Sequence, residues 1–269
     1  MSVYPSVVTA YRDYGYHVVS GLNPLFANDS VLSEYTWIID EAGDVVTDGL
    51  GISLQEVLVI ESLLEVVEPR TCLVIGNALG FSTMVIGFAC PSAHVVALDS
   101  GDDDNSEWGI EVTNQLAQRS GLDVRAVLGR SPQDVPNAVG QLPGAGSEVD
   151  LVLIDGGHTV DQLALDLRAV LPFLSAHGVV VAHDVRFWDL GDAIAQVLGD
   201  DESLWARNLT LTTSGMAVVS RSSKPALHEV CAAFTGDSRA VAAVAREGLA
   251  HQGVAASEQH RRLRESLRS

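Results

Sequence analysis

The sequence is poor in cysteine and in long apolar runs, and each shortage excludes a class of protein. Its cysteines, Cys72, Cys90 and Cys231, are widely spaced and form neither a CxxC pair nor a Cys/His cluster. This pattern argues against a structural zinc site and favours buried thiols in a reducing cytoplasm. Neither an uninterrupted run of about 18 apolar residues nor a basic N-terminal leader is present. We therefore expect a soluble, cytoplasmic protein with no membrane partner.

Positive charge is also scarce. The 269 residues include 16 Lys and Arg against 35 Asp and Glu, for a formal net charge of -19. Such a chain repels a phosphate backbone, so DNA and RNA are poor candidate partners. Residues 221–269 hold eight of the basic side chains against five acidic ones. This basic end suits a solvated helix, a dimer contact or a disordered tail. We expect the solvated helix, and a homo-oligomer remains open.

Composition and hydrophobic periodicity divide the chain into three regions. Residues 1–50 are rich in Tyr, Asn, Asp and Gly, and their weak periodicity predicts an irregular cap or substrate lid. Residues 51–221 form the main domain, and residues 222–269 form a C-terminal helical extension. Aromatic side chains of the first region could stack on a sugar or aromatic ring, or could pin the region to the main domain. They are Tyr11, Tyr14, Tyr16, Tyr35 and Trp37.

Short apolar runs alternate with amphipathic segments in the main domain. Ser53 and Glu56 form a predicted capping box, and the helix that they begin ends at Pro69. Strands are predicted at 72–76, 94–99, 124–129, 150–155, 178–184, 204–212 and 216–221, with helices at 81–90, 107–120, 159–174 and 188–199. The order predicts an α/β, Rossmann-like fold with helices on both faces of a mostly parallel seven-stranded sheet. Because the last two strands are so close in sequence, we expect a terminal antiparallel hairpin.

Two features suggest a nucleoside site at the carboxyl ends of the strands. The turn after the strand at 72–76 reads Gly76-Asn77-Ala78-Leu79-Gly80, and its glycines would let the backbone approach a ligand before a helix that begins near Ser82. The GxxxG spacing differs from the GxGxxG of dinucleotide sites. Asp99 ends the next strand, where a carboxylate can accept both ribose hydroxyls of an adenosine. The alternative is an ordinary loop and cap.

Two further strand ends carry acidic residues and histidines. Asp155 and Asp184 end neighbouring predicted strands, so their carboxylates could converge and bind Mg²⁺ or a similar hard cation. In the alternative interpretation Asp155 caps a helix and Asp184 is solvated. His158 follows two glycines and is the candidate base that removes a proton from a hydroxyl; the alternative is a loop histidine bonded to backbone. His183 directly precedes Asp184.

These motifs resemble those of the class I S-adenosylmethionine-dependent methyltransferases. The similarity runs from about Ser53 to Val219, through LVIGNALGFST, Asp99, DLVLIDGGH, GVVVAHD and the terminal hairpin. It implies S-adenosylmethionine as cofactor. By position it implies a methionine side at Gly76, Asn77, Ala78, Gly80 and Ser82, a ribose contact at Asp99 and an adenine border at Arg130 and Ser131. Many members carry an acidic residue where this chain has Val74, which leaves the anchor for the ammonium group unassigned and makes Asp155 a candidate substitute.

IDGGH followed by a later Asp resembles the metal-dependent O-methyltransferases that act on sugars in bacterial natural products and polysaccharides. The resemblance implies metal ligands at Asp155 and Asp184, a base at His158 and a small-molecule hydroxyl acceptor. His183 stands where a carboxylate is common, and imidazole suits Mn²⁺, Co²⁺ or Zn²⁺ better than Mg²⁺. The rival predictions are a metal-free methyltransferase, an NAD-linked oxidoreductase and a binding protein without chemistry.

Overall fold

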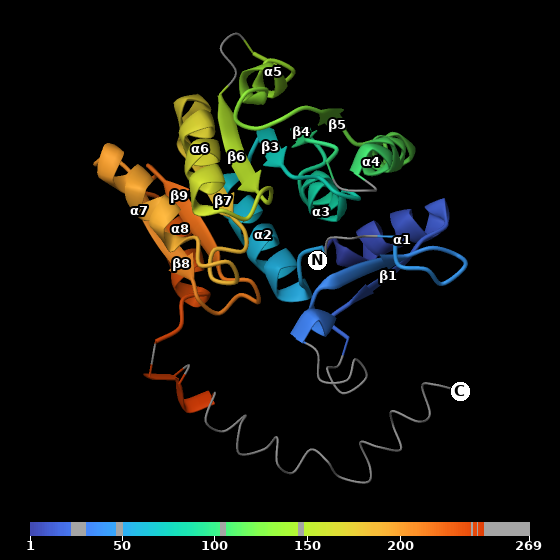
Figure 1. Cartoon of the computed structure of the whole chain (residues 1–269), viewed down its shortest axis with the longest axis horizontal. Coiled ribbons are helices and arrows are strands. Elements are labelled where there is room, and N and C mark those ends of the chain that lie inside the picture. Colours follow the sequence, from blue (N-terminus) through green and yellow to red (C-terminus); the bar gives the residue numbers. More distant parts are fainter. Residues whose placement is uncertain are drawn as a thin grey trace.

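The main domain is built around a seven-stranded sheet with the strand order β5-β4-β3-β6-β7-β9-β8 (Figure 1). The computed structural model describes residues 1–22, 31–46, 51–102, 106–144, 148–237, 239–240 and 242–244. The strands of this sheet are β3 (Thr71–Ile75), β4 (His94–Asp99), β5 (Val124–Leu128), β6 (Val149–Ile154), β7 (Leu174–Ala182), β8 (Trp205–Leu209) and β9 (Met216–Ser220). The five strands β5, β4, β3, β6 and β7 pair in parallel, in that order. Strand β9 is antiparallel to both β7 and β8.

Helices cover both faces of the sheet, because successive strand residues are buried on alternate sides. Leu73 and Ile75 pack with α5, α6 and α7, whereas Cys72 and Val74 pack with α1, α2, α3, α4 and α8. The helices are α1 (Tyr4–Tyr14), α2 (Leu54–Val67), α3 (Phe81–Ala89), α4 (Ser106–Ser120), α5 (Val135–Val139), α6 (Val160–Val170), α7 (Gly191–Asp200) and α8 (Pro225–Ala233). The 3₁₀ turns are η1 (Val31–Glu34) and η2 (Leu171–Phe173).

The predicted fold class is confirmed, and so is the antiparallel hairpin. The Ser53 side chain accepts a hydrogen bond from the Glu56 amide and the Glu56 side chain accepts one from the Ser53 amide, which confirms the capping box. Two boundaries differ from the prediction. Strand β7 begins at Leu174 instead of 178, because η2 ends the preceding helical segment at Phe173. Helix α7 begins at Gly191 instead of 188, because a turned loop continues to Leu190.

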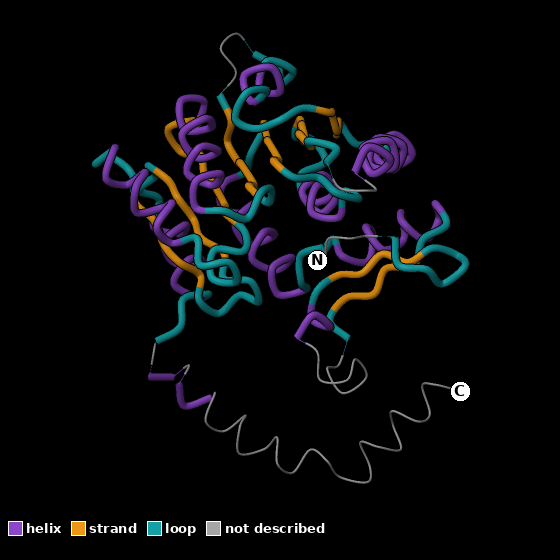
Figure 2. The backbone as a smooth tube through the Cα atoms, viewed as in Figure 1, coloured by secondary structure: helices purple, strands orange, loops and turns teal. Residues whose placement is uncertain are grey.

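The N-terminal region is more regular than predicted in its described residues, and its role as a cap or substrate lid stays a prediction. These residues form α1 and a separate two-stranded antiparallel sheet of β1 (His17–Ser20) and β2 (Thr36–Ile39), visible beside the main sheet in Figure 2. Val7 and Tyr11 lie one helical turn apart and are fully buried, and the Tyr11 hydroxyl donates a 2.5 Å hydrogen bond to the Leu79 carbonyl. Tyr11 therefore pins this region to the main domain, which was one of the two predicted roles.

The C-terminal extension begins as a packed helix. Leu227 and Cys231 of α8 are buried, and α8 contacts α2 and β8. The basic end of the chain, with Arg261, Arg262, Arg264 and Arg268, lies outside the described residues.

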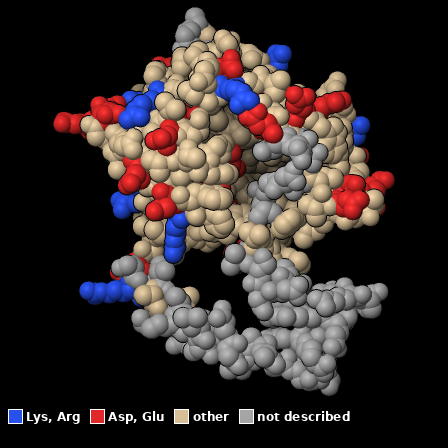
Figure 3. Space-filling view, in the orientation of Figure 1, with Lys and Arg blue, Asp and Glu red and all other residues tan. Residues whose placement is uncertain are grey.

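The surface fits the acidic composition. On the face shown in Figure 3, Lys and Arg side chains of the described residues are scattered among Asp and Glu and form no continuous basic strip. Of the helices within the described ranges, none has the length and apolar character needed to cross a membrane.

The turn after β3 requires its glycines because of contacts inside the protein. Gly76 has φ +89°, and a Cβ there would lie 1.9 Å from the backbone oxygen of Asp155. Gly80 has φ +80°, and a Cβ there would lie 2.1 Å from Oγ1 of Thr113. These two glycines therefore let β3, β6 and α4 approach one another, in addition to any role toward a ligand.

We expect Gly76→Ala to lower the free energy of unfolding by at least about 3 kcal/mol, because the added methyl group meets a backbone atom that cannot move aside. Gly121→Ala is the matched control: it shares a positive φ, +67°, but has open space around its Cβ. Its cost should be about 1 kcal/mol. Urea unfolding of both variants measures the difference, and equal losses would contradict the close contact.

Candidate active site

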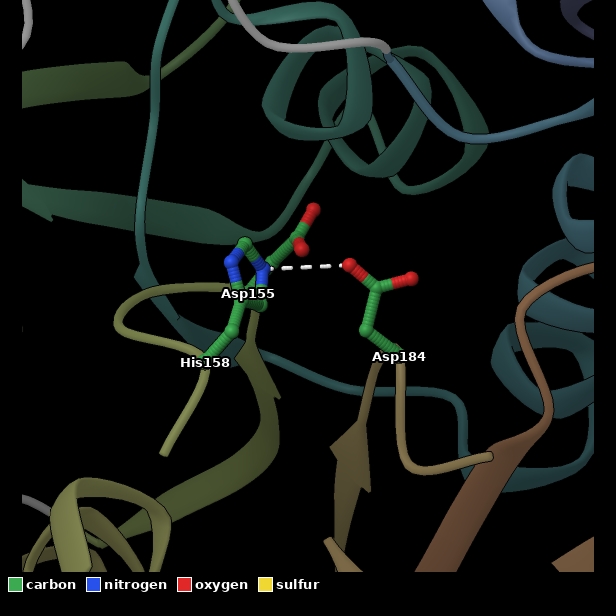
Figure 4. A group of neighbouring side chains, drawn as sticks. All are labelled: Asp155, His158 and Asp184. Atoms are coloured by element: carbon green, nitrogen blue, oxygen red, sulfur yellow. Dashed lines mark ion pairs between the residues drawn. The ribbon is translucent and has the colours of Figure 1, made fainter. Parts of the chain in front are cut away.

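Three side chains of the predicted site converge at the carboxyl ends of β6 and β7 (Figure 4). Asp155 follows β6, and Asp184 lies just beyond β7, in strands that pair in parallel with Ile154 opposite Ala182. One ligand atom from each of Asp155, His158 and Asp184 lies within 4.8 Å of the other two. The structure therefore brings together the residues that the strand-end pattern pointed to.

Backbone geometry holds Asp184 in place. The residue has φ +58°, in the left-handed region that only a few non-glycine residues adopt. Its amide donates a 3.3 Å hydrogen bond to Oγ of Ser214, in the hairpin between β8 and β9. Conformations of this kind persist where the surrounding structure imposes them, and they are concentrated at functional sites.

His158 is the more accessible of the two histidines. Its Nε2 lies 3.0 Å from Oδ2 of Asp184, and its ring stacks on the indole of Trp188 with centroids 5.5 Å apart and planes inclined by 13°. The hydrogen bond with Asp184 raises the pKa of His158 above its usual value, against the opposing effect of burial. With 40% of its side chain exposed, the imidazole is accessible to a ligand and can accept a proton from it through the nitrogen that does not face Asp184.

His183 is buried among three carboxylates. Its Nε2 lies 3.1 Å from Oε2 of Glu56, and its Nδ1 lies 3.0 Å from Oδ1 of Asp155 and 3.3 Å from Oδ1 of Asp184. Burial alone would lower the pKa of His183, but the charges of Asp155 and Glu56 outweigh it and raise the pKa well above its usual value. The two Nδ1 contacts are short, yet neither has the direction of a hydrogen bond, so Nδ1 is buried without a hydrogen-bond partner.

Glu56 belongs to the site, although the sequence indicated only a helix cap. It is fully buried, and its Oε1 accepts hydrogen bonds from the amide (2.8 Å) and hydroxyl (2.5 Å) of Ser214. Burial acts to raise its pKa, but the charge and hydrogen bond of His183, with those of Ser214 and Ser53, lower it to about 2. No local pattern could reveal this role, since His183 lies 127 residues further along the chain.

The donor set suits a divalent cation. Asp155 and Asp184 supply carboxylate oxygens, and His183 supplies the unpartnered Nδ1 that faces both carboxylates, which leaves the accessible His158 beside them as the candidate base. Two ligand atoms bound at about 2.1 Å and at right angles are about 3.0 Å apart, close to the Nδ1 to oxygen distances here. The residues present therefore fit the predicted metal, and a nitrogen ligand favours Mn²⁺ or Co²⁺ over Mg²⁺.

Asp99 organises the glycine turn beside this site. Its Oδ2 accepts hydrogen bonds from the amides of Asn77 (2.7 Å) and Ala78 (2.9 Å), and its Oδ1 accepts one from Gly101 (2.9 Å). The Asn77 side chain points inward and bonds with Thr83 and Thr113, so only its backbone can face a ligand. The predicted ribose contact of Asp99 stays a prediction, and the structure adds that this carboxylate fixes the turn.

The other predicted cofactor residues lie in or beside the same loops. Arg130 pairs with Asp102 across the loops after β5 and β4, and Ser131 donates a 2.6 Å hydrogen bond to Asp166 of α6. Ser82 is buried in the first turn of α3. Their roles toward a cofactor remain predictions.

The departure at Val74 has a structural explanation. Val74 is fully buried in the core, in the strand before the turn. Asp155 follows the neighbouring strand and packs against Gly76, with its amide donating a 2.7 Å hydrogen bond to the Ile75 carbonyl. The backbone of Asp155 therefore lies against the turn, its carboxylate contacts His183, and its role as an anchor for the ammonium group stays a prediction.

An exposed aromatic pair lies beside His158, and no sequence pattern predicts it. Phe187 and Trp188, in the loop after β7, are 50% and 51% exposed, with ring centroids 5.5 Å apart. The loop is nevertheless fixed, because the amides of Arg186 and Phe187 both donate to the Ser214 carbonyl. Tyr35 reaches this loop from the N-terminal region, with its ring edge-on to Phe187. Large apolar rings held in the open beside a candidate base suggest a ligand surface.

A separate cavity of about 730 Å³ opens at the amino-terminal edge of the sheet. Thr71, His94 and Asp150 line it, and Asp150 is already bonded to Thr71 and Ser175. It lies at the strand ends opposite to those that carry Asp155 and Asp184.

Comparisons with known proteins agree with this architecture. Residues 73–185 match the family model of a methyltransferase domain. A cofactor-bound protein from MTB, Rv0187, is 23% identical and matches with a TM-score of 0.53 over 74% of this chain and 90% of its own. The O-methyltransferase TomG from Streptomyces achromogenes, solved in complex with SAM and involved in tomaymycin synthesis, is 15% identical, with a TM-score of 0.53 over 82% and 89%. An O-methyltransferase from Bacillus cereus in complex with SAH is 16% identical, with a TM-score of 0.52 over 62% and 81%.

No curated protein matches the sequence. At these identities the solved structures establish the fold: this chain has a Rossmann-like fold shared with the methyltransferases, and residues 73–185, which hold most of its parallel strands, are similar to the family model of a methyltransferase domain.

We expect Asp99→Asn to lower the free energy of unfolding by about 2 to 3 kcal/mol, because the amides of Asn77 and Ala78 lose a charged acceptor in a buried turn. The same variant should bind adenosine compounds more weakly in calorimetry. Asp102→Asn, which removes an exposed carboxylate from the neighbouring loop, should leave the free energy of unfolding nearly unchanged. Equal stability of the two variants would show that Asp99 does not hold the turn.

Proposed function

We propose that the chain is an S-adenosylmethionine-dependent O-methyltransferase that methylates a hydroxyl group of a small molecule with the help of a divalent cation. The observation that carries the proposal is the convergence of Asp155, His158 and Asp184 beside the Gly76 turn, within a methyltransferase fold. A base and a cation site next to a nucleoside-binding turn suit methyl transfer to oxygen.

The cofactor assignment draws on the turn and on the solved relatives. Gly76, Asn77, Ala78 and Gly80 form the turn, Asp99 fixes it, and Arg130 and Ser131 lie in the next loop. Two solved structures with this fold are complexes with SAM and SAH, which supports S-adenosylmethionine as the cofactor here. When bound, this cofactor supplies a sulfonium methyl group.

In the proposed reaction the acceptor oxygen forms a bond with the methyl carbon as the carbon–sulfur bond breaks. The bonding electron pair remains on sulfur, which becomes a neutral thioether, and His158 takes the hydroxyl proton. Stacking on Trp188 and the hydrogen bond to Asp184 hold the imidazole for that transfer.

Asp155 and Asp184 would hold the cation, with an imidazole as a further ligand. A cation there supplies positive charge that stabilises the developing negative charge on the acceptor oxygens. The rival function is a metal-free methyltransferase, in which the two carboxylates only line the pocket.

The acceptor that we propose is a sugar or oligosaccharide. The exposed rings of Phe187 and Trp188 support an acceptor with a ring, because aromatic side chains present a flat apolar face against which the carbon–hydrogen face of a sugar packs. Tyr35 would place the N-terminal region at the same pocket, as a substrate lid would require.

His158→Ala should reduce turnover by at least about 100-fold, because the hydroxyl proton loses its acceptor, while S-adenosylhomocysteine affinity stays within about threefold. Single-turnover kinetics and calorimetry measure the two quantities. His94→Ala, which alters a histidine at the opposite edge of the sheet, serves as the control. Normal turnover of the His158 variant would rule out its role as base.

Phe187→Ala should raise the KM for the acceptor about tenfold and leave kcat nearly unchanged, since Phe187 touches Tyr35 and Trp188 but not the candidate base. Trp188→Ala should also lower kcat, because His158 loses its stacking partner. Leu165→Ala, an equally exposed apolar residue on α6, is the control. An unchanged acceptor KM in both aromatic variants would remove this loop from the acceptor site.

A further inference from the structure

The buried carboxylate of Glu56 has more partners than a helix cap needs. In an ordinary capping box the acidic side chain bonds back to the amide of the N-cap residue and remains near the surface. Here Oε2 accepts from the Ser53 amide at 2.9 Å and also contacts Nε2 of His183 at 3.1 Å, and the side chain is fully buried. Burying a carboxylate costs free energy unless the carboxylate is paired and hydrogen-bonded. The contact with His183 supplies part of that pairing, and it suggests a role for Glu56 beyond the helix cap.

The contact fixes where the hydrogen of His183 resides. A carboxylate only accepts hydrogen bonds, so Nε2 must carry the hydrogen that it shares with Glu56. In the neutral ring the lone pair is then on Nδ1, the nitrogen that lies 3.0 Å from Asp155 and 3.3 Å from Asp184 and has no hydrogen-bond partner. Histidines that bind metals commonly donate their other N–H to a carboxylate in this way.

We propose that Glu56 is a positioning residue that holds His183 with Nδ1 directed at the cation between Asp155 and Asp184, making His183 the third protein ligand. This inference rests on the metal of the proposed function and extends it to the N-terminus of α2. The Ser214 hydroxyl donates to Glu56 and accepts from the Asp184 amide, so it connects the positioning carboxylate with the loop that carries a proposed metal ligand. A nitrogen ligand at this position selects Mn²⁺, Co²⁺ or Zn²⁺ over Mg²⁺.

Mn²⁺ binding to the purified full-length protein, without cofactor or acceptor, tests the proposal. Free Mn²⁺ is counted by electron paramagnetic resonance in the wild type and in Glu56→Gln. The amide of Gln can donate to Nε2 and shift the ring hydrogen to Nδ1, so we expect affinity to fall about 10- to 100-fold. Ser53→Ala is the matched control: it breaks the other half of the capping box, leaves Glu56 beside His183, and should keep wild-type affinity.

A double-mutant cycle shows whether Glu56 affects Mn²⁺ affinity by orienting His183 or by an effect independent of His183. In His183→Gln the side-chain amide can still donate to Glu56, but no imidazole is present. This variant alone should bind Mn²⁺ as weakly as Glu56→Gln, and adding Glu56→Gln to it should cause no further loss. Additive losses would mean that Glu56 acts independently of His183, and would overturn the proposal.

A measurement on the wild type keeps the proposal testable if a variant fails to fold. With ¹⁵N-labelled histidine and Zn²⁺, long-range ¹H–¹⁵N spectra distinguish a ring metallated at Nδ1 and protonated at Nε2 from the opposite arrangement. The first pattern supports the proposal, and a buried ring without metal at Nδ1 overturns it. Wild type that binds no divalent cation, and whose methyl transfer survives chelation, would instead remove the metal from the proposed function. Tight Mn²⁺ binding by folded Glu56→Gln would remove only the role of Glu56.

Discussion

The interaction on which the site depends is the burial of one imidazole among three carboxylates. Glu56, Asp155 and Asp184 come from α2, β6 and the loop after β7, and His183 contacts all of them. Like charges held so close repel one another unless positive charge lies between them. The fold therefore has to bring in that charge, from a protonated ring or from a cation, and the same requirement keeps α2, the main sheet and the Ser214 hairpin together.

Most of the fold could be predicted because its signals are local. Runs of Val, Leu and Ile marked strands buried on both faces, the Ser53 box marked the start of α2, and the short link after β8 required the hairpin. The N-terminal region was misjudged because three of the apolar residues of α1 are tyrosines, which also suit loops, and its burial of Val7 and Tyr11 depends on α3 and the Leu79 turn. The start of β7 at Leu174 was also missed, because the 3₁₀ turn η2 ends the preceding helical segment at Phe173.

The candidate site was predictable in part for a similar reason. Parallel strands place their ends together, so Asp155 and Asp184 could be paired from the order of elements alone. Glu56 could not, because its contact with His183 arises only when α2 packs on the end of β7. Phe187 and Trp188 lacked any periodic pattern, since they lie in a loop whose shape comes from hydrogen bonds to Ser214.

That loop has a consequence for how such a protein can diversify. Its course is set by main-chain hydrogen bonds, to the Ser214 carbonyl and between Leu190 and Val185, which do not depend on which side chains occupy positions 187 and 188. The Phe187 ring can thus be exchanged for another side chain while Asp184 and Trp188 keep their places. Under the proposed function, substitutions at position 187 change the acceptor surface while the stacking of Trp188 on His158 is retained, so a new acceptor needs no rebuilding of the reaction centre.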